Sequence, residues 1–250
     1  MELSLYVFFA FLGALVASFI GVISERIYTG QSWKTGRSKC NSCKESLGFL
    51  DLIPVFSYVL TFGRCRVCGS KVPYGYPLGE AVMASLFLFG YYTFGLSLQL
   101  LVFLVILGVL FFIVIYDIRH TIVPTEASTA LVLLGLVFAY LESASIHTFG
   151  LTLLVAGVIS LCFFALHFFS RGRAMGLGDA PVVFALSLLA GEQAIEGLLF
   201  SFWIGALFGL GVLLTKPPGK RRNIEIPFVP FLALGYLLAI ISGWQLFVLY

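Results

Sequence analysis

Two aspartates bordering long apolar stretches are the first candidates for chemistry in this sequence. Asp117 ends one apolar run in "FFIVIYDIRHTIVPTEAS", and Asp179 begins another after the glycines of "MGLGD". An ionisable side chain at membrane depth is costly and indicates function. Two carboxylates brought close cannot both ionise cheaply, so they titrate as a pair that holds one proton. Such a pair suits aspartyl proteolysis, in which the ionised member activates water and the protonated member polarises the scissile carbonyl.

The residues around the aspartates allow other interpretations. Gly176 and Gly178 give the backbone freedom for a substrate strand to approach Asp179 closely. Asp179 could instead cap a helix N-terminus, where a carboxylate complements the helix dipole. That explanation is weaker for Asp117 at a helix C-terminus, although Arg119 could offset the unfavourable charge. A proton or ion relay in a transporter is a further alternative for the pair.

Four cysteines form a second candidate site. "CNSC" and "CRVC" place Cys40, Cys43, Cys65 and Cys68 as two C-x-x-C pairs separated by 21 residues. This spacing is typical of a structural tetrathiolate zinc site, in which each pair occupies one edge of the tetrahedron and the intervening chain forms a short hairpin. Four cysteine ligands leave no open position for catalysis. A reduced loop with redox-active or unliganded cysteines is the alternative.

The elements that position these residues are membrane helices. The 250-residue chain is 60% hydrophobic and 11% charged, with a mean hydropathy of +1.04, whereas a soluble domain has about 25% charged residues. Its apolar runs lack the alternation of a membrane barrel, so we expect an all-α polytopic protein with about eight spans. The runs are 3–24, 80–96, 97–116, 124–141, 148–170, 179–191, 196–214 and 227–248. The acidic start and the lack of a cleavage site indicate that the first run is retained.

The distribution of cations predicts the topology. All fifteen Lys and Arg residues lie in four connections on one side of an eight-span arrangement, which the positive-inside rule makes cytoplasmic. Both termini then lie on the non-cytoplasmic side, and both aspartates lie at the cytoplasmic boundary, where they can be neighbours although they are 62 residues apart in sequence. The expected domains are a first span (1–24), a cytoplasmic zinc-ribbon-like loop with the four cysteines (25–79) and a seven-helix membrane domain (80–250). The net charge of +3 is too small to suggest nucleic acid as a partner.

Three other features receive structural interpretations. Cys162, within an apolar run, is expected to be a small packing residue, and His167 a satisfied interior or interfacial histidine. The basic stretch Lys216–Arg222 is interpreted as a topology anchor beside anionic lipid, or as a docking aid for a partner.

Several motifs together resemble the type IV prepilin leader peptidases, which are GxGD-class aspartyl proteases. The matching stretches, in chain order, are "SFIGVISERIYTG" (18–30), the cysteine-containing segment 40–80, "YDIRHTIVP" (116–124), "MGLGD" (175–179) and "IPFVPFLALGY" (226–236). The resemblance covers nearly the whole chain.

The resemblance implies a function for these residues. Asp117 and Asp179 correspond to the two catalytic aspartates of a family that removes a short basic leader from prepilins or pseudopilins after a glycine, at the cytoplasmic face of the bacterial inner membrane. Members of this family with a cysteine-bearing first loop often also methylate the new N-terminus with S-adenosylmethionine, so the resemblance implies this second activity. The sequence does not locate the binding site of the methyl donor.

The sequence departs from the family pattern in two places. Gly21 and Glu25 replace the usual Asn and Tyr after the first span, and Ala180–Pro181 replace the usual Phe-Lys after "GLGD". The lost lysine removes a cation near Asp179, whereas Pro181 is tolerated in a first helical turn. Two other functions remain open. A presenilin-like intramembrane protease shares GxGD, and a proton-coupled transporter could use the pair as a relay but calls for broken helices and inverted repeats.

Overall fold

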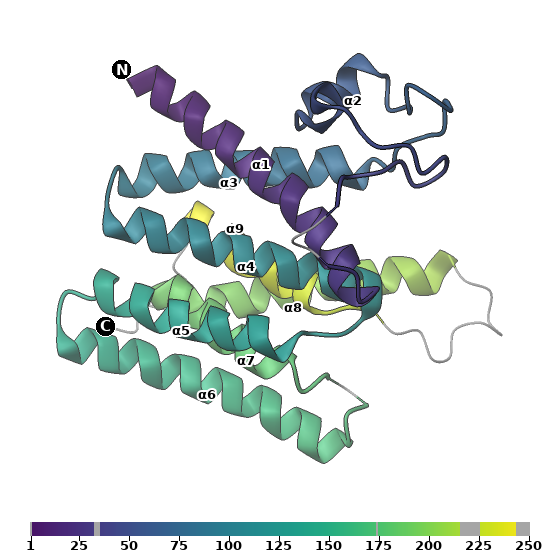
Figure 1. Cartoon of the computed structure of the whole chain (residues 1–250). Coiled ribbons are helices and arrows are strands. Elements are labelled where there is room, and N and C mark those ends of the chain that lie inside the picture. Colours follow the sequence, from purple (N-terminus) through teal and green to yellow (C-terminus); the bar gives the residue numbers. More distant parts are fainter. Residues whose placement is uncertain (1, 33–35, 174, 216–225, 244–250) are drawn as a thin grey trace. The chain divides into compact units, whose positions relative to one another are not determined.

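The computed structural model describes residues 2–32, 36–173, 175–215 and 226–243, and its main elements are helices (Figure 1). Among these residues, β pairing is limited to the isolated antiparallel bridges Lys39–Ser46 and Arg64–Lys71. The expected all-α membrane architecture is confirmed. The chain divides into two compact units, residues 1–112 and 113–250.

Within the described residues, each of the apolar runs contains a helix. In chain order these are α1 (Glu2–Tyr28), α3 (Gly75–Phe94), α4 (Leu98–His120), α5 (Thr125–Glu142), α6 (Ile146–Ser170), α7 (Asp179–Ala190), α8 (Ala194–Thr215) and α9 (Val229–Ser242). Helices are expected because lipid offers the backbone no hydrogen-bond partners.

Within the described residues, five stretches are long and apolar enough to cross a bilayer. They are Leu3–Tyr28, Leu98–His120, Thr125–Glu142, Ile146–Ser170 and Asp179–Thr215, and Val229–Ser242 is a shorter apolar helix. The chain is therefore a multi-pass membrane protein, whereas the count of eight spans and the three domain boundaries stay predictions. The basic stretch 216–222 and the end of the last apolar run lie outside the described residues.

Unit 1 is built on the crossing of α1 and α3 (Figure 1). A Cβ added at Gly13 of α1 would lie 2.5 Å from the carbonyl oxygen of Met83, so only glycine allows the two backbones to approach this closely. Near the C-terminus of α3, the ring of Tyr91 stacks on the ring of Phe9 from α1, with the ring centroids 4.7 Å apart. Gly90 then receives the ring of Phe103 from α4.

The loop between α1 and α3 contains two short helical turns instead of the expected hairpin. These are η1 (Phe49–Leu52) and α2 (Phe56–Leu60), which lie between the cysteine pairs. The hairpin prediction is wrong, because the segment carries Pro54, which cannot donate to a strand ladder. It also carries Phe56, Val59 and Leu60 at helical spacing.

Unit 2 is organised around α7, which packs against α5, α6, α8 and α9. All residues of α7 are buried except Pro181 and Phe184. Its twelve residues extend about 18 Å, short of a full bilayer core. Pro181 lies in the first turn, as expected. The helix ends at Gly191 (φ +55°), and the turn η2 (Gly191–Gln193) leads into α8.

Polar contacts and glycines hold α7 in place. The Ser160 hydroxyl of α6 donates to the carbonyl of Ala180 at 2.9 Å, and the hydroxyls of Ser187 and Tyr236 are 2.8 Å apart, which links α7 to α9. Gly135 of α5 lies against the Ala185 backbone. Because these groups satisfy one another, the buried polar atoms do not weaken the apolar bundle.

Candidate functional site

Asp117 lies in the last turn of α4 and is 5% exposed. Its Oδ2 accepts a hydrogen bond from the backbone N–H of Val229, the first residue of α9, at 3.2 Å. The first N–H groups of a helix lack partners within the helix and carry partial positive charge. The N-terminus of α9 therefore compensates a carboxylate that its own helix does not favour.

Asp179 is the first residue of α7 and is 7% exposed. Its Oδ2 accepts a hydrogen bond from the N–H of Gly176 at 3.1 Å, so the side chain closes the glycine turn that precedes it. The N-cap of α7 is Gly178, so the alternative of Asp179 as the N-cap residue does not hold.

The two aspartates meet at one end of unit 2. Asp117 is close enough to Asp179 for the two carboxylates to interact electrostatically. Three elements form this end: the C-terminus of α4 and the N-termini of α7 and α9. The structure thus gathers the candidate residues, while their catalytic role stays a prediction.

Gly178 is required by close packing next to Asp179. A Cβ at this position would lie 2.7 Å from the Cβ of Val123, which follows α4 in the "VP" pair. The backbone N–H of Gly176 donates the hydrogen bond that Asp179 Oδ2 accepts. The two glycines therefore have separate tasks: one admits a neighbouring side chain, and the other presents its backbone to the carboxylate.

His167 also supports the glycine turn. Its Nδ1 lies 2.9 Å from the carbonyl oxygen of Met175, and because a carbonyl only accepts, Nδ1 carries the proton. The His167 ring also interacts electrostatically with Asp179. The expectation that His167 is a satisfied histidine and not a ligand agrees with this hydrogen bond. The hydrogen bond from His167 to the turn was not predicted from the sequence, because the ring reaches Met175 only when residues 167–179 are folded.

The four cysteines converge in the loop of unit 1. The Sγ atoms of Cys40, Cys43, Cys65 and Cys68 all lie within 4.8 Å of one another, and the cysteines are free thiols. The Sγ atoms of Cys40 and Cys68 lie 3.9 Å apart. This distance is close to the ~3.8 Å between two sulfur ligands of a tetrahedral site whose metal–sulfur bonds are near 2.3 Å. The cluster is therefore positioned to bind a metal ion.

The two cysteine pairs have the same backbone design, 25 residues apart. Cys40 N–H donates to Glu45 and Lys44 N–H to Cys40, just as Cys65 N–H donates to Ser70 and Gly69 N–H to Cys65. Lys44 and Gly69, at equivalent positions, both have positive φ. Hydrogen bonds from the backbone of Cys43 and Ser42 lower the pKa of the Cys40 thiol to about 6, and hydrogen bonds from Ser70 lower the pKa of the Cys68 thiol. The pKa of Cys43 is instead raised to about 11, by burial and by its thiol neighbours, so each turn offers one thiol that ionises readily. A thiolate is the form that binds metal.

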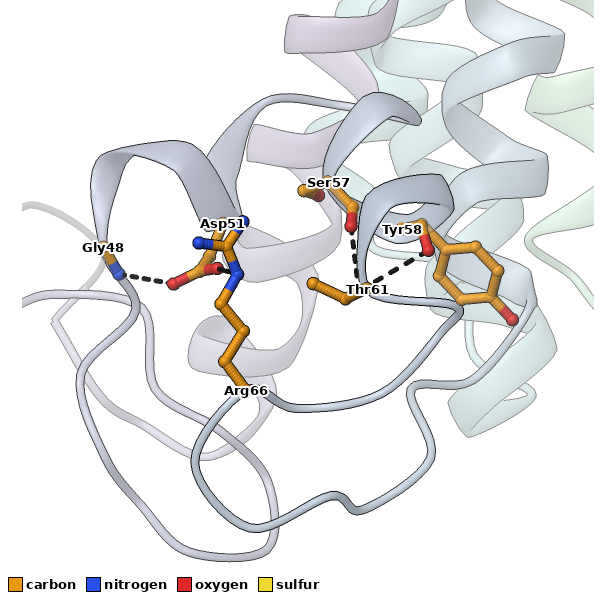
Figure 2. A network of polar contacts seen from close by, with 6 residues as sticks. All are labelled: Gly48, Asp51, Ser57, Tyr58, Thr61 and Arg66. Carbon is orange, nitrogen blue, oxygen red and sulfur yellow. Dashed lines mark hydrogen bonds and ion pairs between the residues drawn. The ribbon is translucent and has the colours of Figure 1, made fainter.

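A polar network connects η1 to the second cysteine turn (Figure 2). Asp51 Oδ1 pairs with Arg66 Nε at 2.9 Å, and Asp51 Oδ2 accepts from the N–H of Gly48 at 3.0 Å. The loop is thus braced by contacts beyond the cysteines themselves.

Cys162 does not match its predicted role. It is exposed on α6, so it does not pack in the protein interior as expected. In a membrane helix, an exposed small apolar side chain is compatible with a lipid-facing position.

Comparison with known proteins gives two family matches. Residues 11–94 match the bacterial peptidase A24 N-terminal domain, and residues 104–213 match the type IV leader peptidase family. A protein of Legionella pneumophila named prepilin leader peptidase/N-methyltransferase is 30% identical over 83% of this chain and 72% of its own length. The chain belongs to the type IV leader peptidase family.

Other members with the same name are similarly related. One from Bacillus subtilis (strain 168) is 29% identical over 92% of both chains, and one from Myxococcus xanthus (strain DK1622) is 31% identical over 87% of this chain and 66% of its own length. No solved structure matches. The leader peptidase match contains both aspartates, and the N-terminal match contains all four cysteines.

Proposed function

We propose that this protein is a membrane aspartyl peptidase that removes the leader from type IV prepilins or pseudopilins and N-methylates the new N-terminus. The observation that carries the proposal is the convergence of Asp117 and Asp179, two buried carboxylates from different helices, at one end of unit 2. The names of the relatives support the same two activities.

The aspartates divide the work of hydrolysis. The pair holds one proton, because two adjacent carboxylates cannot both ionise cheaply. The ionised member takes a proton from water, whose oxygen attacks the carbonyl carbon of the leader's final glycine. The protonated member gives its proton to the carbonyl oxygen, and the tetrahedral intermediate collapses as the leaving amine takes a proton. Backbone N–H groups of Val229 and Gly176 hold the two Oδ2 atoms during these steps.

The metal that best fits the cysteine cluster is zinc. Four thiolates at tetrahedral spacing fill every coordination position, so the ion would fold the loop and take no part in hydrolysis. Cys40, Cys43, Cys65 and Cys68 would hold it.

Methylation requires S-adenosylmethionine as a co-substrate. The nitrogen of the new N-terminal amine would attack the methyl carbon of the donor as the methyl–sulfur bond breaks, S-adenosylhomocysteine would leave, and the methylated amine would lose a proton. The residues that bind this donor are unassigned.

We place the protein in the bacterial inner membrane with the aspartates at the cytoplasmic boundary and both termini on the other side. The distribution of Lys and Arg supports this orientation. In this arrangement the substrate's hydrophobic helix stays in the bilayer while its basic leader meets the aspartates from the cytosol.

The test is co-expression of a prepilin with wild type, Asp117→Asn or Asp179→Asn, followed by mass measurement of the pilin N-terminus. Either substitution should reduce leader removal on the order of 10²–10⁴-fold, the range of general acid–base catalysis. Glu126→Gln, which removes an exposed carboxylate from the first turn of α5, is the matched control and should process normally. Wild-type processing by either aspartate variant would refute the peptidase assignment, and a cleaved product that never gains a methyl group would refute the second activity.

A further inference from the structure

The loop between the cysteine pairs presents an unusual surface. Seven large apolar side chains in and beside η1 and α2 are exposed, and we call them the apolar loop surface. They are Phe49, Leu50, Leu52, Phe56, Val59, Leu60 and Phe62. Phe62 is the extreme case, with 89% of its surface exposed. A soluble protein rarely leaves so contiguous a stretch uncovered, so this surface indicates an interaction.

The distribution of polar and apolar side chains on α2 is the reverse of that on a surface helix in water. Phe56, Val59 and Leu60 share one face by their i, i+3, i+4 spacing and are exposed, whereas Ser57 and Thr61 are half-buried. The Thr61 hydroxyl donates back to the carbonyl of Ser57 at 2.8 Å (Figure 2). Polar groups thus satisfy one another inside while apolar groups face outward.

The same inversion occurs in η1. Phe49 and Leu50 point outward, while the half-buried Asp51 is satisfied by Arg66 and by the backbone of Gly48 (Figure 2). Outward apolar and inward polar groups are stable when the surrounding medium is lipid.

A second observation places the start of α2 beside α1 and α3. The N–H of Val55, immediately before α2, donates to Glu80 Oε2 at 2.7 Å. Glu80 is buried in α3 and is also hydrogen-bonded by the Ser18 side chain of α1. Glu80 lies about 8 Å inside the start of α3, and Ser18 about 15 Å inside the end of α1. The start of α2 is therefore held alongside these helices instead of beyond their ends.

The backbone at Val55 shows how firmly this position is held. Its φ of +60° is in the region that favours glycine, and a β-branched residue is rare there. The hydrogen bond to Glu80 holds the chain in this conformation and satisfies an N–H that lipid could not.

The charge of the loop matches the surface of a membrane. Residues 25–79 contain eight Lys and Arg against three Asp and Glu, a net charge of +5. Next to α2, a recess of about 500 Å³ is lined by Tyr58, Phe62 and Tyr74 together with Arg64 and Lys71. Aromatic and basic side chains in combination are typical of the lipid–water interface, where anionic headgroups attract cations.

We propose that η1 and α2 form an interfacial anchor, whose apolar loop surface inserts into the lipid–water interface of the membrane that α1 crosses. The cysteine turns on either side are then held at the membrane surface, not free in the cytosol. This inference does not depend on the catalytic role of the aspartates.

The anchor can be tested by tryptophan quenching in the full-length protein. Trp33, Trp203 and Trp244 are replaced by Phe, and single tryptophans are introduced by Phe56→Trp, Phe62→Trp or Phe49→Trp. The protein is reconstituted into vesicles of phosphatidylethanolamine and phosphatidylglycerol with or without brominated acyl chains. Ser42→Trp, in the exposed turn between Cys40 and Cys43, is the polar control, and a variant that keeps only Trp203, exposed on α8, is the lipid-facing control.

The proposal predicts that brominated lipid quenches the tryptophans at 49, 56 and 62 to an extent approaching Trp203, and well beyond Ser42→Trp. Three positions guard against one variant that fails to fold. The proposal is overturned if all three show water-like emission that brominated lipid does not change. It is also overturned if their emission shifts only after a prepilin is added and is not quenched, because the surface then binds the substrate's apolar helix.

Discussion

The cysteine cluster and the aspartate pair are assembled in opposite ways. Each cysteine turn is closed by backbone hydrogen bonds within ten residues, and the cluster lies in an exposed loop. The aspartates are buried, and the hydrogen bond from Val229 to Asp117 spans 112 positions of sequence. The metal site therefore needs an ion to join two locally formed halves, whereas the aspartate pair needs the packing of several helices and no added group.

The largest effect that should distinguish the two sites is expected from a change in the packing around Gly178. Gly178→Ala should displace the glycine turn, because its Cβ would meet Val123. A shift of about 1 Å at a catalytic group costs on the order of 10²-fold in rate, so leader cleavage should fall by that amount. The measurement is the cleavage rate of purified protein on a prepilin.

A second substitution makes the Gly178 prediction specific. Val123→Gly removes the atom that a Cβ at 178 would meet, so the double variant should recover much of the lost rate. If the double variant is as slow as Gly178→Ala alone, the proposed contact is not the cause.

Metal removal should affect the loop more than the aspartate pair. Cys40→Ser or Cys68→Ser should abolish metal binding and expose residues 37–71 to trypsin, because the two turns lose the group that joins them. Cleavage should fall less than in Gly178→Ala, since the aspartates lie in the other compact unit. Metal analysis and limited digestion check this result, with Cys162→Ser as the matched control. Unchanged metal content in the Cys40 and Cys68 variants would exclude the tetrathiolate site.

His167 should have a smaller effect. His167→Leu removes the hydrogen bond to Met175, which corresponds to a rate loss of about 2- to 10-fold if the full contribution of one bond reaches the active site. His167→Asn can place an amide N–H near the Nδ1 position and should retain most of the rate at neutral pH. Equal losses in both variants would show that the hydrogen bond is not what His167 contributes.

Cys162 supplies the smallest expected effect. Because it is exposed on α6, Cys162→Ala should leave cleavage, methylation and thermal stability unchanged. A clear loss of stability would show that this face of α6 is covered by protein and not by lipid.

Much of the fold could be predicted because lipid restricts the backbone to helices. The apolar runs predicted the positions of the long helices, and the spacing of Cys40, Cys43, Cys65 and Cys68 predicted a metal-binding cluster. Both signals are local in sequence. The motifs that resemble the leader peptidase family also indicated that Asp117 and Asp179 form the candidate catalytic pair.

The predictions failed where long-range packing or the surrounding medium decides. The segment between the cysteine pairs forms η1 and α2 instead of a hairpin. These turns expose apolar side chains, whereas a protein surface in water exposes polar ones. The position of α7 inside unit 2 could not be inferred from its composition, because a lipid-facing helix is equally apolar. The support of the glycine turn by His167 depends on a hydrogen bond that no spacing reveals.

The central claim is that Asp117 and Asp179 act as one unit, and a double-mutant cycle tests it most directly. Leader cleavage is measured for wild type, Asp117→Asn, Asp179→Asn and the double variant. If the pair shares one proton, each single substitution removes the same reaction, and the double variant should be no slower than the slower single. Losses that multiply in the double variant, or a single variant that retains the wild-type rate, would contradict the account.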